Sequence, residues 1–201
     1  SGNDSLANYQ QVLRTVRYEN TSVNPETAAR RIRFVVDDGS SLTGTATSTV
    51  TVQSVNSPPN LTLPTSVDTD EDQPIAIQGI SVSDFDIEVG TLRMAFRSNR
   101  GTITLNDSIA GGFGSAQIQN NGTSEVIVQA TLDQLNNTLS ASDGVVYQGS
   151  PNSNGTDTLR VRVSDTEDFS RGTVQIHVAP VNDAPIAQND RFEVAAGSTL
   201  T

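Results

Sequence analysis

Hydrophobic and polar residues alternate strictly in several short stretches of the chain. Residues 158–165 place Leu or Val at every second position with Arg between them, and residues 173–178 alternate Val174, Ile176 and Val178 with polar residues. This period of two is typical of half-buried β-strands, so His177 is expected on the solvent side. Similar patterns predict further strands at residues 75–82, 92–96, 102–105 and 125–128.

The same arrangement of strands occurs twice. Residues 31–38, 45–52 and 55–59 recur as residues 158–165, 173–178 and 181–185, an offset of 126 or 127 residues. Upstream, the segment 13–18 matches the region 139–147. The sequence therefore predicts an internal structural repeat.

A Val-Asn-x-x-Pro string ends each copy of the repeat and predicts a semi-rigid linker, because proline cannot pair within a central strand. We expect a partial unit at residues 1–56, a complete unit at 57–182 and the opening strand of a third at 183–201. The partial unit has a possible helical turn near residues 9–13. Many short strands favour an all-β sandwich.

The composition narrows the function classes. Hydrophobic residues make up 34% and aromatic residues 4% of the chain, which disfavours a large α/β enzyme core. The net charge of −11 disfavours nucleic acid as a partner. Cysteine is absent, no apolar run is long enough for a membrane span, and the start without Met is expected for a processed chain or a fragment. Asp outnumbers Glu 16 to 7, which fits either turn chemistry or calcium binding.

Three segments resemble a known family when read in order. They are residues 71–86, with an acidic start and an Asp-x-Asp, the late strand 155–165 that ends in Asp, and the linker 181–185. They are similar to the cadherin-like, immunoglobulin-like tandem repeats of large secreted RTX-type adhesins, and more distantly to cadherins. The resemblance implies tandem antiparallel Ig-like (cadherin-like) β-sandwiches, one complete and two partial, in an extracellular or cell-surface protein.

The resemblance also implies calcium ions between successive repeats. Matched residue by residue, Asp84, Asp86 and Asp165 lie at the entry end of the complete unit, beside Asn56 in the linker. Glu71 faces the exit junction, with Asn182 and Asp183. Hard oxygen ligands of this kind suit calcium. The alternative is that these carboxylates cap turns through hydrogen bonds to the backbone, and the linkers carry fewer acidic residues than those of cadherins.

The remaining motifs give weaker indications of function. The single histidine, His177, and the absence of Cys and Lys leave few catalytic groups, so an enzyme is not expected. The glycine-rich stretch 110–115 is expected to be a flexible hairpin loop. Seven Asn-x-Ser/Thr sequons predict surface glycans if the source glycosylates secreted proteins; they lie at Asn3, Asn20, Asn60, Asn106, Asn121, Asn136 and Asn154.

From these observations we expect an extracellular structural or adhesive repeat protein that forms a stiff rod or a head-to-tail filament. Its partners would be adjacent repeats or other copies of itself, and possible cell-surface or glycan ligands. Phe192 and Val194 would belong to a strand that completes a neighbouring partial sandwich; alternatively, the partial units reflect a fragment of a longer chain. The alternative function is a carbohydrate-binding or spacer module of a secreted multidomain protein.

Overall fold

The complete repeat folds as two packed layers of β-strands. A computed structural model describes residues 5–22, 24–37, 43–87, 90–185, 187–191 and 193–197. One layer is a six-stranded sheet in the order β4-β13-β12-β7-β10-β9, and the other contains a three-stranded sheet, β5-β11-β8, and a pair, β3-β6. The first layer comprises β4 (Ser66–Asp70), β7 (Leu92–Arg97), β9 (Ile118–Gln119), β10 (Glu125–Ala130), β12 (Gly155–Ser164) and β13 (Phe169–Ala179). The second comprises β3 (Asn60–Thr62), β5 (Ile75–Ala76), β6 (Ser81–Ser83), β8 (Gly101–Leu105) and β11 (Val145–Gly149).

The alternation read from the sequence gives the core. Val161 and Val163 on β12 and Val174 and Ile176 on β13 are buried, whereas His177 is exposed. These side chains pack in one hydrophobic cluster with residues of the opposite layer, including Tyr147 on β11. The all-β Ig-like sandwich predicted from the sequence is therefore confirmed, and the predicted strand register is correct.

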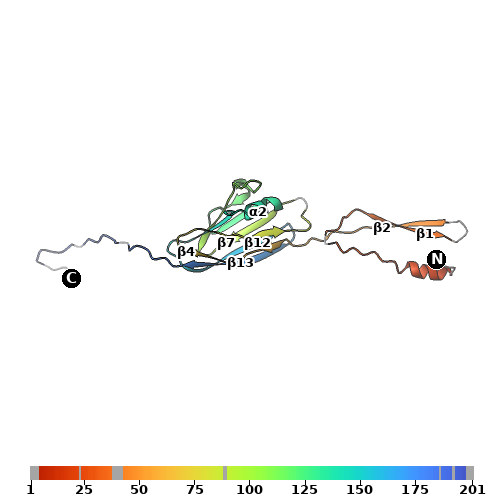
Figure 1. Cartoon of the computed structure of the whole chain (residues 1–201), viewed down its shortest axis with the longest axis horizontal. Helices are drawn as coiled ribbons and strands as arrows, with labels where there is room; N and C mark the ends of the chain where they lie inside the picture. The colour runs from red at the N-terminus through yellow and green to blue at the C-terminus, as the bar shows by residue number, and fades with distance from the viewer. Residues whose placement is uncertain are drawn as a thin grey trace.

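One strand differs from the antiparallel expectation. β4 pairs with β13 in parallel, with Val67 opposite Ile176. The first strand of this sheet thus runs in the same direction as the last strand. As a consequence, the chain enters the sandwich at one end and leaves at the other, so the N-terminal hairpin and the C-terminal segment lie at opposite ends (Figure 1).

A glycine explains why the stretch 75–82 is two strands instead of one. Gly79 has a φ of +81°, a conformation that residues with a side chain rarely adopt. The chain turns there between β5, which pairs with β11, and β6, which pairs with β3. Two short helical segments complete the unit: η1 (Ser115–Gln117), and α2 (Leu132–Leu139), which is capped by Thr131.

The N-terminal unit contains a helix and a hairpin without a covering layer. α1 (Leu6–Leu13) precedes a hairpin of β1 (Arg30–Asp37) and β2 (Thr43–Val50), the order in which α2, β12 and β13 follow one another along the chain, but among the described residues no strand between α1 and β1 corresponds to β11. Ile32 and Phe34 are only half-buried, and Val36 is 53% exposed, although their counterparts in β12 are buried. The apolar face of this hairpin is therefore largely uncovered by the described residues.

Candidate functional site at the entry junction

Carboxylates from two loops meet the linker where the chain enters the sandwich. Asn56, in the linker, donates from Nδ2 to Oδ2 of Asp165 at 3.1 Å and to Oδ2 of Asp168 at 3.4 Å. The backbone N–H of Ser57 donates to Oδ2 of Asp86 at 2.7 Å. The loop after β6 and the turn between β12 and β13 thus both hold the linker. We call Asn56, Asp84, Asp86 and Asp165 the entry cluster.

Two of these carboxylates also cap their own turns. Oδ1 of Asp84 accepts from the backbone N–H of Asp86 at 3.2 Å. Oδ1 of Asp165 accepts from the backbone N–H groups of Glu167 and Asp168, each at 2.6 Å. The turn-capping role considered from the sequence is therefore present, and it uses one oxygen of each carboxylate.

The two carboxylates differ in electrostatic environment. Burial is the main reason that the pKa of Asp84 lies above its usual value, and the nearby carboxylates of Asp86 and Asp165 act in the same direction. Burial acts in the same direction on Asp165, but hydrogen bonds from the Asp168 N–H, the Asn56 amide and the Glu167 N–H outweigh it and lower its pKa. The second oxygen of Asp84, Oδ2, is buried without a hydrogen-bond partner. Asp84 is thus the member of the cluster whose charge is least well compensated.

The entry cluster borders a hollow of about 570 Å³ that Arg93 and Gln129 also line. Within the described part of the chain, no three His, Cys, Asp or Glu side chains are gathered as a ready metal-binding group. Calcium takes six to eight oxygens, including amide and backbone carbonyls. The carboxylates here would need such neutral oxygens to complete a coordination shell.

At the exit end, Glu71 holds the departing linker. Its side chain is only 6% exposed. Oε1 accepts from the N–H of Val181 at 2.7 Å, and Oε2 accepts from Nδ2 of Asn154 at 3.3 Å. Asn182 and Asp183 are exposed, and Asn182 donates to the carbonyl of Asp183. Glu71 therefore lies at the exit linker, and each of its carboxylate oxygens accepts a hydrogen bond from the protein.

The predicted sequons have different environments. Asn121 exchanges two hydrogen bonds with the backbone of Leu105, and Asn136 does the same with Val82, so each amide extends a strand edge. A glycan on either nitrogen would compete with this pairing. Asn106 donates to Asp143, and Asn154 to Glu71. Asn20 and Asn60 are exposed, and Asn3 lies outside the described residues.

Of the two residues assigned to strand exchange, Val194 is 53% exposed in an extended C-terminal segment. Phe192 lies outside the described residues. No helix in the described ranges is long and apolar enough to cross a membrane.

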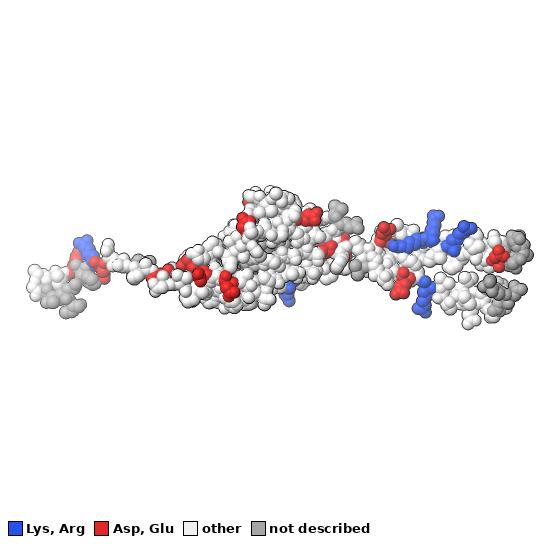
Figure 2. Space-filling view, viewed as in Figure 1, with Lys and Arg blue, Asp and Glu red and all other residues white. Residues whose placement is uncertain are grey.

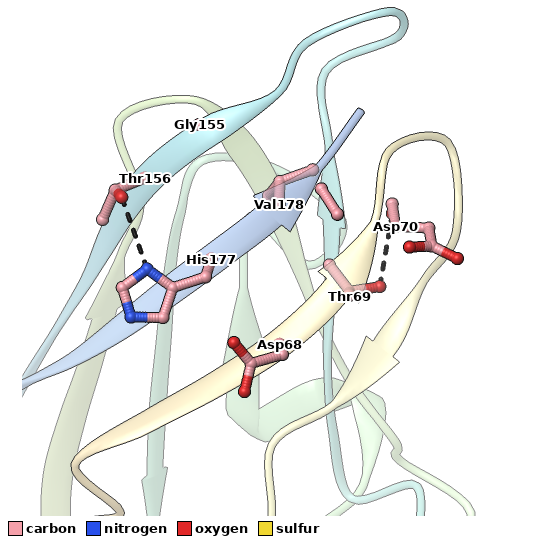
Figure 3. Close-up of a pocket in the computed structure, with 8 residues that line it drawn as sticks. Asp68, Thr69, Asp70, Gly155, Thr156, His177 and Val178 are labelled. Carbon is pink, nitrogen blue, oxygen red and sulfur yellow. Dashed lines mark hydrogen bonds between the residues drawn. The ribbon is translucent and has the colours of Figure 1, made fainter. Parts of the chain in front are cut away.

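His177 lies beside a shallow groove of about 460 Å³ between β13, β12 and β4 (Figure 3). Its Nδ1 is 3.4 Å from Oγ1 of Thr156, and it lies opposite Asp68 in the sheet register. The three side chains project from neighbouring strands at the surface. Thr156 is thus a hydrogen-bonding neighbour of the histidine on the exposed side of the sheet.

A buried polar network was not anticipated from the sequence. Asp157 is 3% exposed and accepts from Ser98 Oγ at 2.5 Å and from the hydroxyl of Tyr147 at 3.0 Å. Backbone N–H groups of Asn99, Arg100 and Thr158 also donate to it. The sequence does contain a signal for this network. Asp157 lies two positions before the buried Leu159 in β12, so the alternation places both side chains on the core side of the sheet.

Hydrogen bonding determines the ionisation of this network. Burial tends to raise the pKa of Asp157, but hydrogen bonds from Ser98, the backbone and Tyr147 outweigh it and hold the pKa below 3.8. Burial, and then the negative charge of Asp157, raise the pKa of Tyr147. The phenol therefore remains protonated and donates to the carboxylate.

Comparisons with known proteins yield distant structural similarity. No family model matches the chain, and no curated protein matches it. Domains 1–6 of the surface layer protein SbsC align with 78% of this chain and 17% of their own, at 16% identity and a TM-score of 0.37. Titin domains Z1Z2 in complex with telethonin align with 77% of this chain and 63% of their own, at 14% identity and a TM-score of 0.33. Sidekick-1 immunoglobulin domains 1–5 align with 75% of this chain and 25% of their own, at 11% identity and a TM-score of 0.29. The chain thus spans less than two thirds of each of these structures, and similarity this low identifies no family.

Proposed function

We propose that this chain is a segment of an extracellular or cell-surface rod built from tandem β-sandwich repeats, with a structural or adhesive role. The parallel pairing of β4 with β13 is the observation that carries the proposal. It directs the incoming and outgoing linkers to opposite ends of the sandwich (Figure 1). Repeats joined in this way extend end to end instead of folding back on one another.

Both linkers are held by hydrogen bonds to the sandwich, which supports a stiff connection. At the entry end, the linker residues Asn56 and Ser57 bind carboxylates of two loops. At the exit end, the buried Glu71 accepts from the N–H of Val181. Each junction thereby loses freedom to bend near the end of its sandwich.

Calcium would stiffen the entry junction further. Asp84, Asp86 and Asp165 would supply carboxylate oxygens, and Asn56 would supply an amide oxygen. The buried Oδ2 of Asp84 has no hydrogen-bond partner, and burial, together with the negative charges of Asp86 and Asp165, raises the pKa of Asp84; both observations fit a bound cation. A divalent ion would compensate the negative charges that the protein alone leaves close together.

Replacement of Asp84 with Asn separates the calcium proposal from turn capping. Because the fold raises the pKa of Asp84, its contribution to stability is present below pH 3.8 and is lost as the pH rises through the folded-state pKa. At neutral pH without calcium, Asp84→Asn should therefore melt at a higher temperature than the wild type. Saturating calcium should stabilise the wild type, by about 2.7 kcal/mol at one hundred times its dissociation constant. Calcium should not stabilise the Asp84→Asn variant in this way.

The measurement is thermal melting at neutral pH in calcium or chelator, with magnesium as a control for ionic strength. Asp107→Asn, at an exposed carboxylate away from the entry cluster, is the matched control and should keep the calcium response. A wild-type melting temperature that is the same in calcium and chelator would contradict a calcium site. In that case the carboxylates act as turn caps alone.

The uncovered face of the N-terminal hairpin suggests how units associate. In the complete repeat, β4 flanks β13, but β2 of the hairpin has no such neighbour among the described strands. We infer that an opening segment of a second copy, residues 183–201 with Phe192 and Val194, pairs beside β2 by main-chain hydrogen bonds. The contact joins different surfaces of the two molecules, so it propagates head to tail.

Deletion of residues 186–201 tests this association. The full chain should form concentration-dependent oligomers, and the deletion should convert them to monomers because it removes the donated strand. Size-exclusion chromatography with light scattering measures both states. Oligomers that persist after the deletion would rule out strand exchange through this segment.

A further inference from the structure

Arginines gather on the outer face of the six-stranded sheet. Residues 57–182 contain six Arg and fifteen acidic residues. Five of the six Arg occupy exposed positions that alternate with buried core residues on β7, β12 and β13. We call this set the arginine face: Arg93, Arg97, Arg160, Arg162 and Arg171.

The strand register places these cations directly beside one another. Arg160 lies opposite Arg97, and Arg162 lies opposite Arg171. Like charges at directly opposite positions of a sheet are destabilising. The arrangement therefore opposes stability in the isolated protein.

The arginines lack compensating ion pairs. Across the described ranges, the ion pair within 4 Å joins Arg191 to Glu193 and involves none of the five. Arg160 donates to the neutral amide of Asn99, and Arg162 stacks over the ring of Phe169 at 4.3 Å. Glu125 lies opposite Arg97 and is the carboxylate nearest to them in the register. The positive charge of this face is thus largely available to an external anion.

Small residues between the arginines create room for a ligand. Ala95, Gly172 and Thr173 line a hollow of about 540 Å³ together with one carboxylate and four arginines: Glu125, Arg97, Arg160, Arg162 and Arg171. Phe169, at one end of the face, is 48% exposed. Guanidinium groups, a hydroxyl and an exposed ring are therefore grouped on one surface.

The geometry of the guanidinium groups indicates the kind of anion. Neighbouring arginine positions are about 5 Å apart across strands and about 7 Å apart along a strand. Acidic residues are scattered over the visible face of the sandwich in Figure 2, so an anion is disfavoured away from the arginine face. A polymer with one planar carboxylate per sugar fits the arginine face, because guanidinium binds carboxylates through two parallel hydrogen bonds.

We propose that the arginine face binds a carboxylated polysaccharide. The carboxylates lie against Arg160, Arg162 and Arg171, and the sugar rings lie along the hollow towards Phe169. The hollow lined by Arg160, Arg162 and Arg171 is separate from the entry cluster and from the hairpin, and Arg93, which borders the entry hollow, is not among its lining residues. If the arginine face did not bind such a polysaccharide, the rod proposal would be unaffected.

Binding of polygalacturonate to the full chain, measured by calorimetry in low salt with chelator present, tests the proposal. The double variant Arg160→Gln/Arg162→Gln should bind more than about tenfold more weakly, because it loses two charged hydrogen-bonding partners. The control Arg100→Gln/Arg191→Gln changes the net charge equally but lies off the face, and should bind like the wild type. Added salt should weaken the wild-type interaction.

The double variant should melt no lower than the wild type, since it removes two like-charge neighbours, so weaker binding cannot result from unfolding. Dextran, which is neutral, should not bind, and poly-glutamate and single-stranded DNA should bind more weakly than polygalacturonate. Equal loss of binding in the two double variants would overturn the proposal. Tighter binding of poly-glutamate or DNA, or no binding of polygalacturonate, would overturn it as well.

Discussion

Replacing Val163 with Asp should unfold the complete sandwich. Val163 is fully buried and lies opposite Met94 in the adjacent strand, so the new carboxylate would have neither water nor a cation as a partner. We expect a loss of about 5 kcal/mol or more, which is comparable with the entire stability of a domain of this size. Circular dichroism and urea unfolding measure this loss.

His177→Ala is the matched control for the same sheet. His177 is exposed and has Thr156 as its side-chain neighbour, so its loss should change the unfolding free energy by less than about 0.5 kcal/mol. If His177→Ala were the more damaging change, the strand register would be shifted by one residue.

Asp157→Ala should have the second largest effect. The substitution leaves the hydroxyls of Ser98 and Tyr147 and nearby backbone N–H groups without an acceptor inside the protein. Each unsatisfied buried group costs about 1–3 kcal/mol, so we expect a total loss of about 3 kcal/mol or more. Asp107→Ala, at an exposed carboxylate, should be nearly neutral.

The same network predicts a dependence on pH. The folded state lowers the pKa of Asp157, so its stabilising contribution is present above the unfolded value of about 3.8 and is lost as the pH falls through the folded-state pKa. Urea unfolding from pH 6 to pH 2 should show this loss in the wild type. Asp157→Asn should reduce the acid-dependent part of the curve. An unchanged acid dependence in that variant would assign the effect to other carboxylates.

The sequence predicted most of the sheet but not all of its pairings. β12 and β13 were predicted in the correct register because their apolar residues alternate over several positions. β4 was not predicted, since its Ser-Val-Asp-Thr-Asp sequence has a single apolar residue, and its parallel pairing with β13 depends on the path of the whole chain. The glycine-rich stretch 110–115 was expected to be flexible, yet Phe113 within it is buried in the core. An isolated aromatic residue between glycines gives no periodic signal.

The candidate site was predictable only in part. The resemblance to cadherin-like repeats singled out Asp84, Asp86 and Asp165, but the hydrogen bond from Asn56 to Asp165 spans 109 positions and cannot be read from local pattern. The alternation recognised in the sequence begins at residue 158 and does not include Asp157, although the parity of Asp157 in β12 is that of a core residue. The sequon motif likewise gave no indication that Asn136 pairs with the backbone of Val82.

Small-angle X-ray scattering of the full chain in calcium and in chelator tests the rod with calcium-stiffened junctions most directly. Measurements are made at a concentration where light scattering reports monomers, for the wild type and for Asp84→Asn. We predict an elongated particle whose pair-distance distribution extends further and ends more sharply in calcium, and a variant whose profile is the same in both conditions. A compact particle, or a wild-type profile that calcium does not change, would contradict the account.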